Sequence, residues 1–128
     1  MRNHTLIGER IISAAPSLRP VAEIVRASHE RWDGTGYPDG LAGFEIPLGA
    51  RIVAVCDAFS AMCQVRPYGA VLTEHEALDE LRASAGSQFD PALVAAFCVL
   101  RGSSAGPRFA RASRQAATGD VLAGEAAA

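Results

Sequence analysis

Apolar side chains recur every three to four positions along most of this chain, which is the spacing of an amphipathic α-helix. The pattern predicts a first helix over residues 4–15, stopped by Pro16, and a second from Pro20 to about His29. The side chains predicted to be buried are Leu6, Ile7, Ile11, Ile12 and Ala15 in the first helix and Val21, Ile24 and Val25 in the second.

Three more helices are expected in the second half of the chain. Pro47 opens one over residues 48–64, and Thr73 with Glu76 forms a capping-box sequence for another, which should reach about Ala85 and end at Gly86. Asp90 and Pro91 should cap and start a last helix that ends near residue 101. The predicted buried face of the helix over 48–64 comprises Ile52, Val55, Cys56, Phe59, Met62 and Cys63.

Residues 30–47 interrupt the helical pattern with several glycines and a Gly-Tyr-Pro triplet at 36–38. A structured loop of this length inside a compact domain is usually functional. Residues 102–128 are mainly Gly, Ser and Ala with scattered Arg, a composition typical of a disordered tail. The expected organisation is therefore an all-α domain over residues 1–101 with one long loop, followed by the tail over 102–128.

Composition narrows the class of protein. Hydrophobic residues make up 49% of the chain, as in globular proteins, and the net charge of -2 gives no electrostatic attraction to DNA or acidic lipid. No run approaches the roughly 20 apolar residues that span a bilayer. The odd number of cysteines and the absence of a Cys-x-x-Cys pair predict that Cys56, Cys63 and Cys98 are small buried residues in a reducing cytoplasm.

Three side chains are candidates for metal chemistry: His4, His29 and Asp57. Asp57 is the only charged residue between Arg51 and Arg66, in an otherwise apolar helix, and a buried carboxylate needs a cation, a metal ion or a strong donor. Two histidines and an aspartate on three helices are a plausible ligand set for a transition metal. By spacing alone, a partly exposed histidine at a helix end and a solvent-facing aspartate remain alternatives.

Other polar and aromatic residues have plainer interpretations. His75 lies in the first turn of an amphipathic helix and is expected to be solvated. Trp32 at the entrance of the loop is expected to pack into the core rather than to stack on a base.

The sequence HERWDGTGYPDGLAGFEIPLGARIVAVCDAFSAM at residues 29–62 resembles the signature segment of the HD-GYP family. The resemblance covers roughly residues 4–98, and includes HTLIGERI at 4–11, RPY at 66–68, EAL at 76–78 and GSQFDP at 86–91. Members of this family are similar to the HD phosphohydrolases and hydrolyse the bacterial second messenger cyclic di-GMP. The resemblance thus implies an all-α helical bundle that holds two or three iron or manganese ions.

The resemblance also assigns roles to individual residues. It implies that His4, His29 and Asp57 are metal ligands and that Arg66 and Tyr37 contact the substrate, for which the fork of donors on an arginine suits a phosphate. Gly36, Tyr37 and Pro38 form the motif that names the family. The implied partners are cyclic di-GMP and, for a regulatory role, diguanylate cyclase or receiver domains.

Departures from the family pattern leave the activity open. The family's metal-bridging His-Asp pair lies upstream of the residue matched by His4, and this chain begins three residues before His4. Ser28, Ser60 and Gly69 replace a histidine, an aspartate and a basic residue. A truncated chain and a decayed relative both explain these departures. The functions they allow are a cyclic di-GMP phosphodiesterase, a non-catalytic binding module, or an HD phosphohydrolase acting on another phosphoester.

Overall fold

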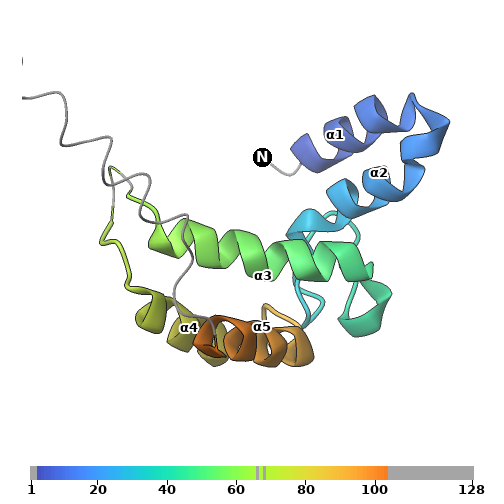
Figure 1. Cartoon of the computed structure of the whole chain (residues 1–128). Coiled ribbons are helices and arrows are strands. Elements are labelled where there is room, and N and C mark those ends of the chain that lie inside the picture. The colour runs from blue at the N-terminus through green and yellow to red at the C-terminus, as the bar shows by residue number, and fades with distance from the viewer. Residues whose placement is uncertain (1–2, 66, 68, 104–128) are drawn as a thin grey trace, which may run out of the picture. The chain divides into compact units, whose positions relative to one another are not determined.

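The computed structural model describes residues 3–65, 67 and 69–103, and within these ranges the chain is helical with no β-strand (Figure 1). Two isolated β-bridges join Asp33 to Ala42 and Ala85 to Phe89. The expected all-α class is confirmed. The elements are α1 (His4–Ser13), η1 (Pro16–Leu18), α2 (Arg19–Arg26), η2 (Ala27–His29), η3 (Gly43–Glu45), α3 (Leu48–Cys63), α4 (Glu74–Ala83) and α5 (Pro91–Ser103), where η marks a 3-10 turn.

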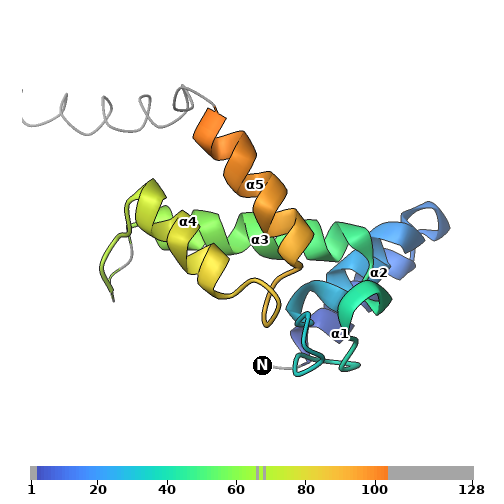
Figure 2. The same cartoon turned by 90° about the horizontal axis from the view of Figure 1, so that it is seen from below.

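Helices α1 and α2 lie side by side in both views (Figures 1 and 2). Small residues allow the close approach: a Cβ at Gly8 would lie only 2.9 Å from Cγ1 of Val25. The one buried side chain of α1 is Thr5, and that of α2 is Ala22. The predicted buried stripe is therefore wrong at Ile7 and Ile11 in α1 and at Val21 in α2, which are exposed.

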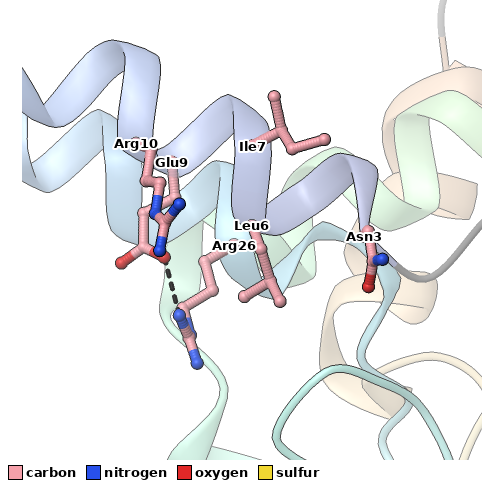
Figure 3. Close-up of a pocket in the computed structure, with 6 residues that line it drawn as sticks. All are labelled: Asn3, Leu6, Ile7, Glu9, Arg10 and Arg26. Atoms are coloured by element: carbon pink, nitrogen blue, oxygen red, sulfur yellow. Dashed lines mark hydrogen bonds and ion pairs between the residues drawn. The ribbon is translucent and has the colours of Figure 1, made fainter.

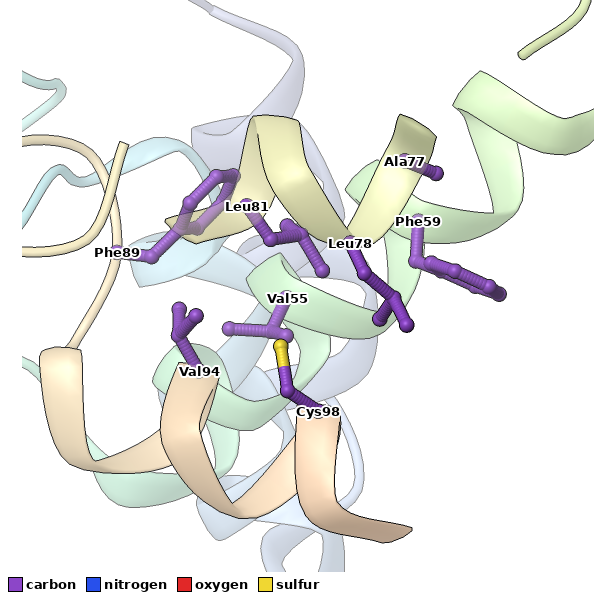
Figure 4. Packing of buried hydrophobic residues seen from close by; sticks show 8 residues of the cluster. All are labelled: Val55, Phe59, Ala77, Leu78, Leu81, Phe89, Val94 and Cys98. Atoms are coloured by element: carbon purple, nitrogen blue, oxygen red, sulfur yellow. The ribbon is translucent and has the colours of Figure 1, made fainter. Parts of the chain in front are cut away.

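The main core lies where α3, α4 and α5 meet, and its largest fully buried side chain is Leu81. The cluster comprises Val55, Phe59, Ala77, Leu78, Leu81, Phe89, Val94 and Cys98 (Figure 4). A second, smaller cluster of Ala27, Ile46 and Ala50 joins the start of α3 to η2. Together these two clusters bury one side of α3.

The predicted buried face of α3 is too wide. Val55 and Phe59 are buried as expected and Met62 and Cys63 are half-buried, but Ile52 and Cys56 are exposed. The expectation of three buried cysteines holds fully only for Cys98. An apolar pattern identifies the side chains that can be buried, whereas burial also requires an element to cover them.

Local capping signals proved more reliable. The Thr73 hydroxyl accepts a hydrogen bond from the Glu76 amide, and the Glu76 carboxylate accepts one from the Thr73 amide, so the capping box that starts α4 is confirmed. Helix α4 ends at Ala83, two residues before the expected end near Ala85.

The buried side chain of Asp90 caps α5 and also connects it to α3. One carboxylate oxygen accepts from the Ala92 amide at 2.9 Å, and the other accepts from Nη1 of Arg51 at 2.8 Å. Because both members of this ion pair are largely buried, it fixes the start of α5 against α3. Sequence reasoning identified the cap and missed the ion pair.

Helix α5 continues to Ser103, so the first two residues of the expected tail are helical, and residues 104–128 lie outside the described part of the chain. None of the helices described is both long and apolar enough to cross a membrane.

The core makes a direct prediction for stability. We expect Leu81→Ala to lower the free energy of unfolding by about 2–5 kcal/mol, because it leaves a cavity beside Val55 and Val94. Leu48→Ala is the control: Leu48 is exposed at the start of α3, and its loss should cost less than about 1 kcal/mol. Urea unfolding followed by circular dichroism measures both, and equal losses would contradict the assigned core.

Candidate functional site

Two of the three predicted ligands meet directly. Nε2 of His4 lies 2.8 Å from Nε2 of His29, so one ring donates a hydrogen bond to the other, and the ring centroids are 4.7 Å apart in an edge-to-face arrangement. His4 opens α1 and His29 closes η2, so the packing of α1 along α2 brings together residues that are 25 positions apart.

The Gly-Tyr-Pro triplet lies against the residues that surround His29. The Tyr37 ring stacks on the His29 ring with centroids 5.3 Å apart, and the Tyr37 amide donates to the His29 carbonyl. A Cβ on Gly36 would lie 2.5 Å from the Arg31 nitrogen and 2.6 Å from Cα of Glu30. Only glycine allows the loop this close, so Gly36 is what lets Tyr37 reach His29. Pro38 follows through a cis peptide bond.

Glu30 binds the part of the same loop that follows the Gly-Tyr-Pro triplet. Its side chain is buried, and its two carboxylate oxygens accept hydrogen bonds from the amides of Asp39 at 2.7 Å and Leu41 at 3.0 Å. Hydrogen bonds from amides to a carboxylate are stronger than those between neutral groups. Sequence reasoning gave Glu30 no role, although its position as the first residue of the loop was a signal that could have identified it.

The loop is also joined to the turn before α5. The amide of Trp32 donates to the Gln88 carbonyl and that of Asp33 to the Ser87 carbonyl. Trp32 is half-buried and packs edge-on against Phe44, which is itself exposed, and it belongs to neither core cluster, so its expected packing into the core is not confirmed. Asp33 accepts from the hydroxyl and the amide of Thr35, and these bonds hold the pKa of the Asp33 carboxyl below its usual value.

Arg26 links the loop to α1. Its Nε and Nη2 donate to the two carboxylate oxygens of Asp39 at 2.7 and 2.9 Å, and its Nη1 donates to Glu9 at 2.6 Å. The bonds from Arg26 lower the pKa of the Asp39 carboxyl. Figure 3 shows the Arg26–Glu9 ion pair beside a surface pocket along α1. No sequence signal marked this network.

Asp57 shares a pocket with His29 and Tyr37. The pocket has a volume of about 400 Å³, and small side chains of α3, Ala54, Ala58 and Ala61, form part of its wall. Asp57 itself is exposed, so the solvent-facing alternative describes its position in this structure better than the buried carboxylate does. His75 is exposed on α4, as predicted, 3.5 Å from the Asp79 carboxylate.

The donor atoms at the site fit part of a metal-ligand set. Two imidazole nitrogens bound to one ion at about 2.1 Å and at right angles lie roughly 3 Å apart, close to the separation of the His4 and His29 nitrogens. Asp57 adds a carboxylate to the pocket that His29 lines. Within residues 3–65, 67 and 69–103, however, no three His, Cys, Asp or Glu side chains lie close enough together to hold an ion.

The residues that depart from the family pattern have other contacts. The Ser28 hydroxyl donates to the Val25 carbonyl within its own helical segment, and the Ser60 hydroxyl accepts from the Gln64 side chain. Gly69 is exposed. Arg66, the expected phosphate contact, lies outside the described residues.

Comparisons with known proteins identify the family to which the chain is similar. A family model described as HD domain matches residues 1–93. The chain is 46% identical over 102 residues to a cyclic di-GMP phosphodiesterase of Thermotoga maritima, covering 78% of this chain and 28% of that protein. It is also 46% identical over 104 residues to a cyclic di-GMP phosphodiesterase response regulator of Xanthomonas campestris, covering 80% and 27%. The chain thus spans little more than a quarter of the length of these relatives.

A solved structure gives the same result for the fold. It is a cyclic GMP-AMP specific phosphodiesterase of Vibrio cholerae, which matches with a TM-score of 0.62 and 28% identity. The match covers 78% of this chain and 23% of that one.

The close approach at Gly36 can be tested by one methyl group. We expect Gly36→Ala to displace the loop, because the added Cβ overlaps backbone atoms that cannot move aside, and to remove the Tyr37–His29 ring contact. NMR of the aromatic protons would measure the contact. Gly102→Ala is the control, since its Cβ would point into open space. A Gly36→Ala spectrum that keeps the ring contact would contradict the packing described here.

Proposed function

This chain belongs to the HD domain family, in its HD-GYP branch, and from that premise we propose that it supplies part of the centre of a metal-dependent phosphodiesterase that hydrolyses cyclic di-GMP. The observation that carries the proposal is the approach of the His4 and His29 nitrogens beside the pocket that His29 shares with Asp57. The names of the Thermotoga and Xanthomonas relatives support the substrate. We assign this role to residues 1–101.

His4, His29 and Asp57 are the residues that would hold metal in this proposal, with two or three iron or manganese ions in the complete centre. Such ions, when bound, supply neutralisation of charge on the phosphate oxygens and a hydroxide at neutral pH. The chain's own residues would orient the ligands and contact the substrate. Tyr37 keeps the His29 ring in place by stacking on it and borders the pocket, where it can meet the substrate. Arg66 would contact a phosphate.

Two observations favour other functions. The solved Vibrio structure, and a second Vibrio relative at 36% identity, are named for cyclic GMP-AMP, which makes that dinucleotide the alternative substrate. The Ser28 hydroxyl is engaged with the Val25 carbonyl, and serine is a poor replacement for a histidine ligand. This second observation favours a non-catalytic module that binds a signalling partner such as a diguanylate cyclase or a receiver domain.

A chimeric enzyme tests the proposal. The matching 102-residue segment of the Thermotoga phosphodiesterase is replaced by that of this chain. We expect the chimera to hydrolyse cyclic di-GMP and Asp57→Asn to reduce its turnover by at least about 100-fold, since a lost ligand removes the activated hydroxide. Arg66→Ala should raise the barrier by about 2–4 kcal/mol through one lost donor to a developing anion.

His75→Ala is the control variant, because His75 lies on the exposed face of α4, and it should leave turnover unchanged. Wild-type turnover in Asp57→Asn would show that the ligand assignment is wrong. Faster hydrolysis of cyclic GMP-AMP than of cyclic di-GMP would favour the alternative substrate. A folded chimera that binds cyclic di-GMP without hydrolysing it would favour the binding module.

We expect the 128-residue chain alone to bind metal weakly, because its described residues do not bring three ligands together. Elemental analysis of the purified chain should find well under one iron or manganese ion per molecule. Two or more tightly bound ions would contradict this expectation and would indicate a more complete site than the one described.

A further inference from the structure

We propose that Arg26 is a positioning residue. It keeps the rings of His4, His29 and Tyr37 in contact by joining α1 and the loop to the end of α2. That this positioning serves a metal site rests on the proposed function, whereas the hydrogen bonds of Arg26 do not depend on it. Arg26 acts through Glu9 and Asp39, to which its guanidinium donates.

The contacts of Arg26 are directional. Two parallel N–H donors meet both oxygens of Asp39, and a third donor meets Glu9, so one planar guanidinium fixes two carboxylates from different segments. Such bidentate pairs define both distance and orientation, which a lysine ammonium cannot do.

The positions of the partners connect them to the site. Arg26 lies three residues before His29, and Asp39 lies two residues after Tyr37. The amide of Asp39 donates to Glu30, the residue that follows His29, while its side chain binds Arg26. The segment that carries His29 is therefore tied to the loop at both of its ends, by Arg26 on one side and by Glu30 on the other.

Helix α1 needs such a connection. Within this fully described helix only Thr5 is buried, Leu6 and Ile12 are half-buried, and Ile7 and Ile11 are 56% and 71% exposed, so a polar contact can add to the apolar packing that places α1 on α2. Glu9 is on the same helix as His4, one to two turns further along, and its bond to Arg26 adds a polar contact that sets the position of α1 along α2. That position decides whether the His4 and His29 nitrogens meet.

A comparison within the chain separates this role from that of an ordinary surface ion pair. Arg82 binds Asp79 at 2.9 Å, three residues away on α4, and both side chains are more than half exposed. Pairs of that kind contribute about 0–1 kcal/mol and do not connect separate elements. Arg26 instead connects α1, α2 and the loop through three hydrogen bonds to two carboxylates, and the side chains of Arg26, Glu9 and Asp39 are 36%, 28% and 37% exposed, against 51% and 57% for Arg82 and Asp79.

NMR of the full 128-residue chain tests the proposal without metal or nucleotide. The quantities measured are the cross-peak between the His4 and His29 rings and the ring-current shift between Tyr37 and His29. We expect both to be lost in Arg26→Met and weakened in Arg26→Lys, while the methyl signals of Val55 and Leu81 in the core stay in place. Arg82→Met, the matched control, should change neither ring contact.

Two further measurements test the proposal even if Arg26→Met fails to fold. Asp39→Asn keeps Arg26 and disrupts only the bidentate pair, so it should loosen the Tyr37–His29 contact more than the core. High salt should act on the wild-type chain in the same direction, because exposed charges are screened.

Ring contacts that persist in Arg26→Met and Asp39→Asn would overturn the proposal. Loss of the core signals together with the ring contacts would overturn it too, since Arg26 would then serve the whole fold. Neither result bears on hydrolysis by the chimera, and a failed Asp57→Asn test would leave this geometry unaffected, so the two proposals fail separately.

Discussion

The site depends on one buried carboxylate. Glu30 is 6% exposed, and burying its charge without strong donors would cost several kcal/mol. The amides of Asp39 and Leu41 supply those donors, which forces the loop to wrap around the segment that begins at His29. Wrapping this tightly requires a residue without a side chain at Gly36. The bonds to Glu30 thus hold Asp39 and Leu41 close to the segment that carries His29, on which Tyr37 stacks.

Two kinds of interaction hold the described helices. Apolar packing around Leu81 joins α3, α4 and α5, and it depends little on salt. Around His4 and His29, the contacts are mainly hydrogen bonds and ion pairs of partly exposed groups, such as the Arg26 network. Such contacts give precise geometry for a small gain in stability. The candidate site is consequently held together by hydrogen bonds and ion pairs, which fix the orientation of side chains well but are weakened by salt.

The sequence predicted what local signals determine. The helix starts at Glu74 and Pro91 followed from their capping residues, and the all-α class followed from periodicity. It could not predict which apolar residues are covered, so Ile11 and Ile52 were wrongly placed in the interior. The roles of Glu30 and Arg26 were also missed, because their partners lie 9 to 17 residues away and meet only in the folded chain.

The two histidines of the site also show what sequence spacing alone cannot determine. Spacing alone made His4, His29 and Asp57 a plausible ligand set and left a partly exposed helix-end histidine as the alternative. The structure places the His4 and His29 nitrogens in contact. In the family pattern a second histidine stands where this chain has Ser28, whose hydroxyl is bound to its own helical segment. In the proposed function, η2 therefore provides His29 as its ligand. Tyr37 stacks on that ring, while Glu30 and Arg26 bind the loop segment that follows Tyr37.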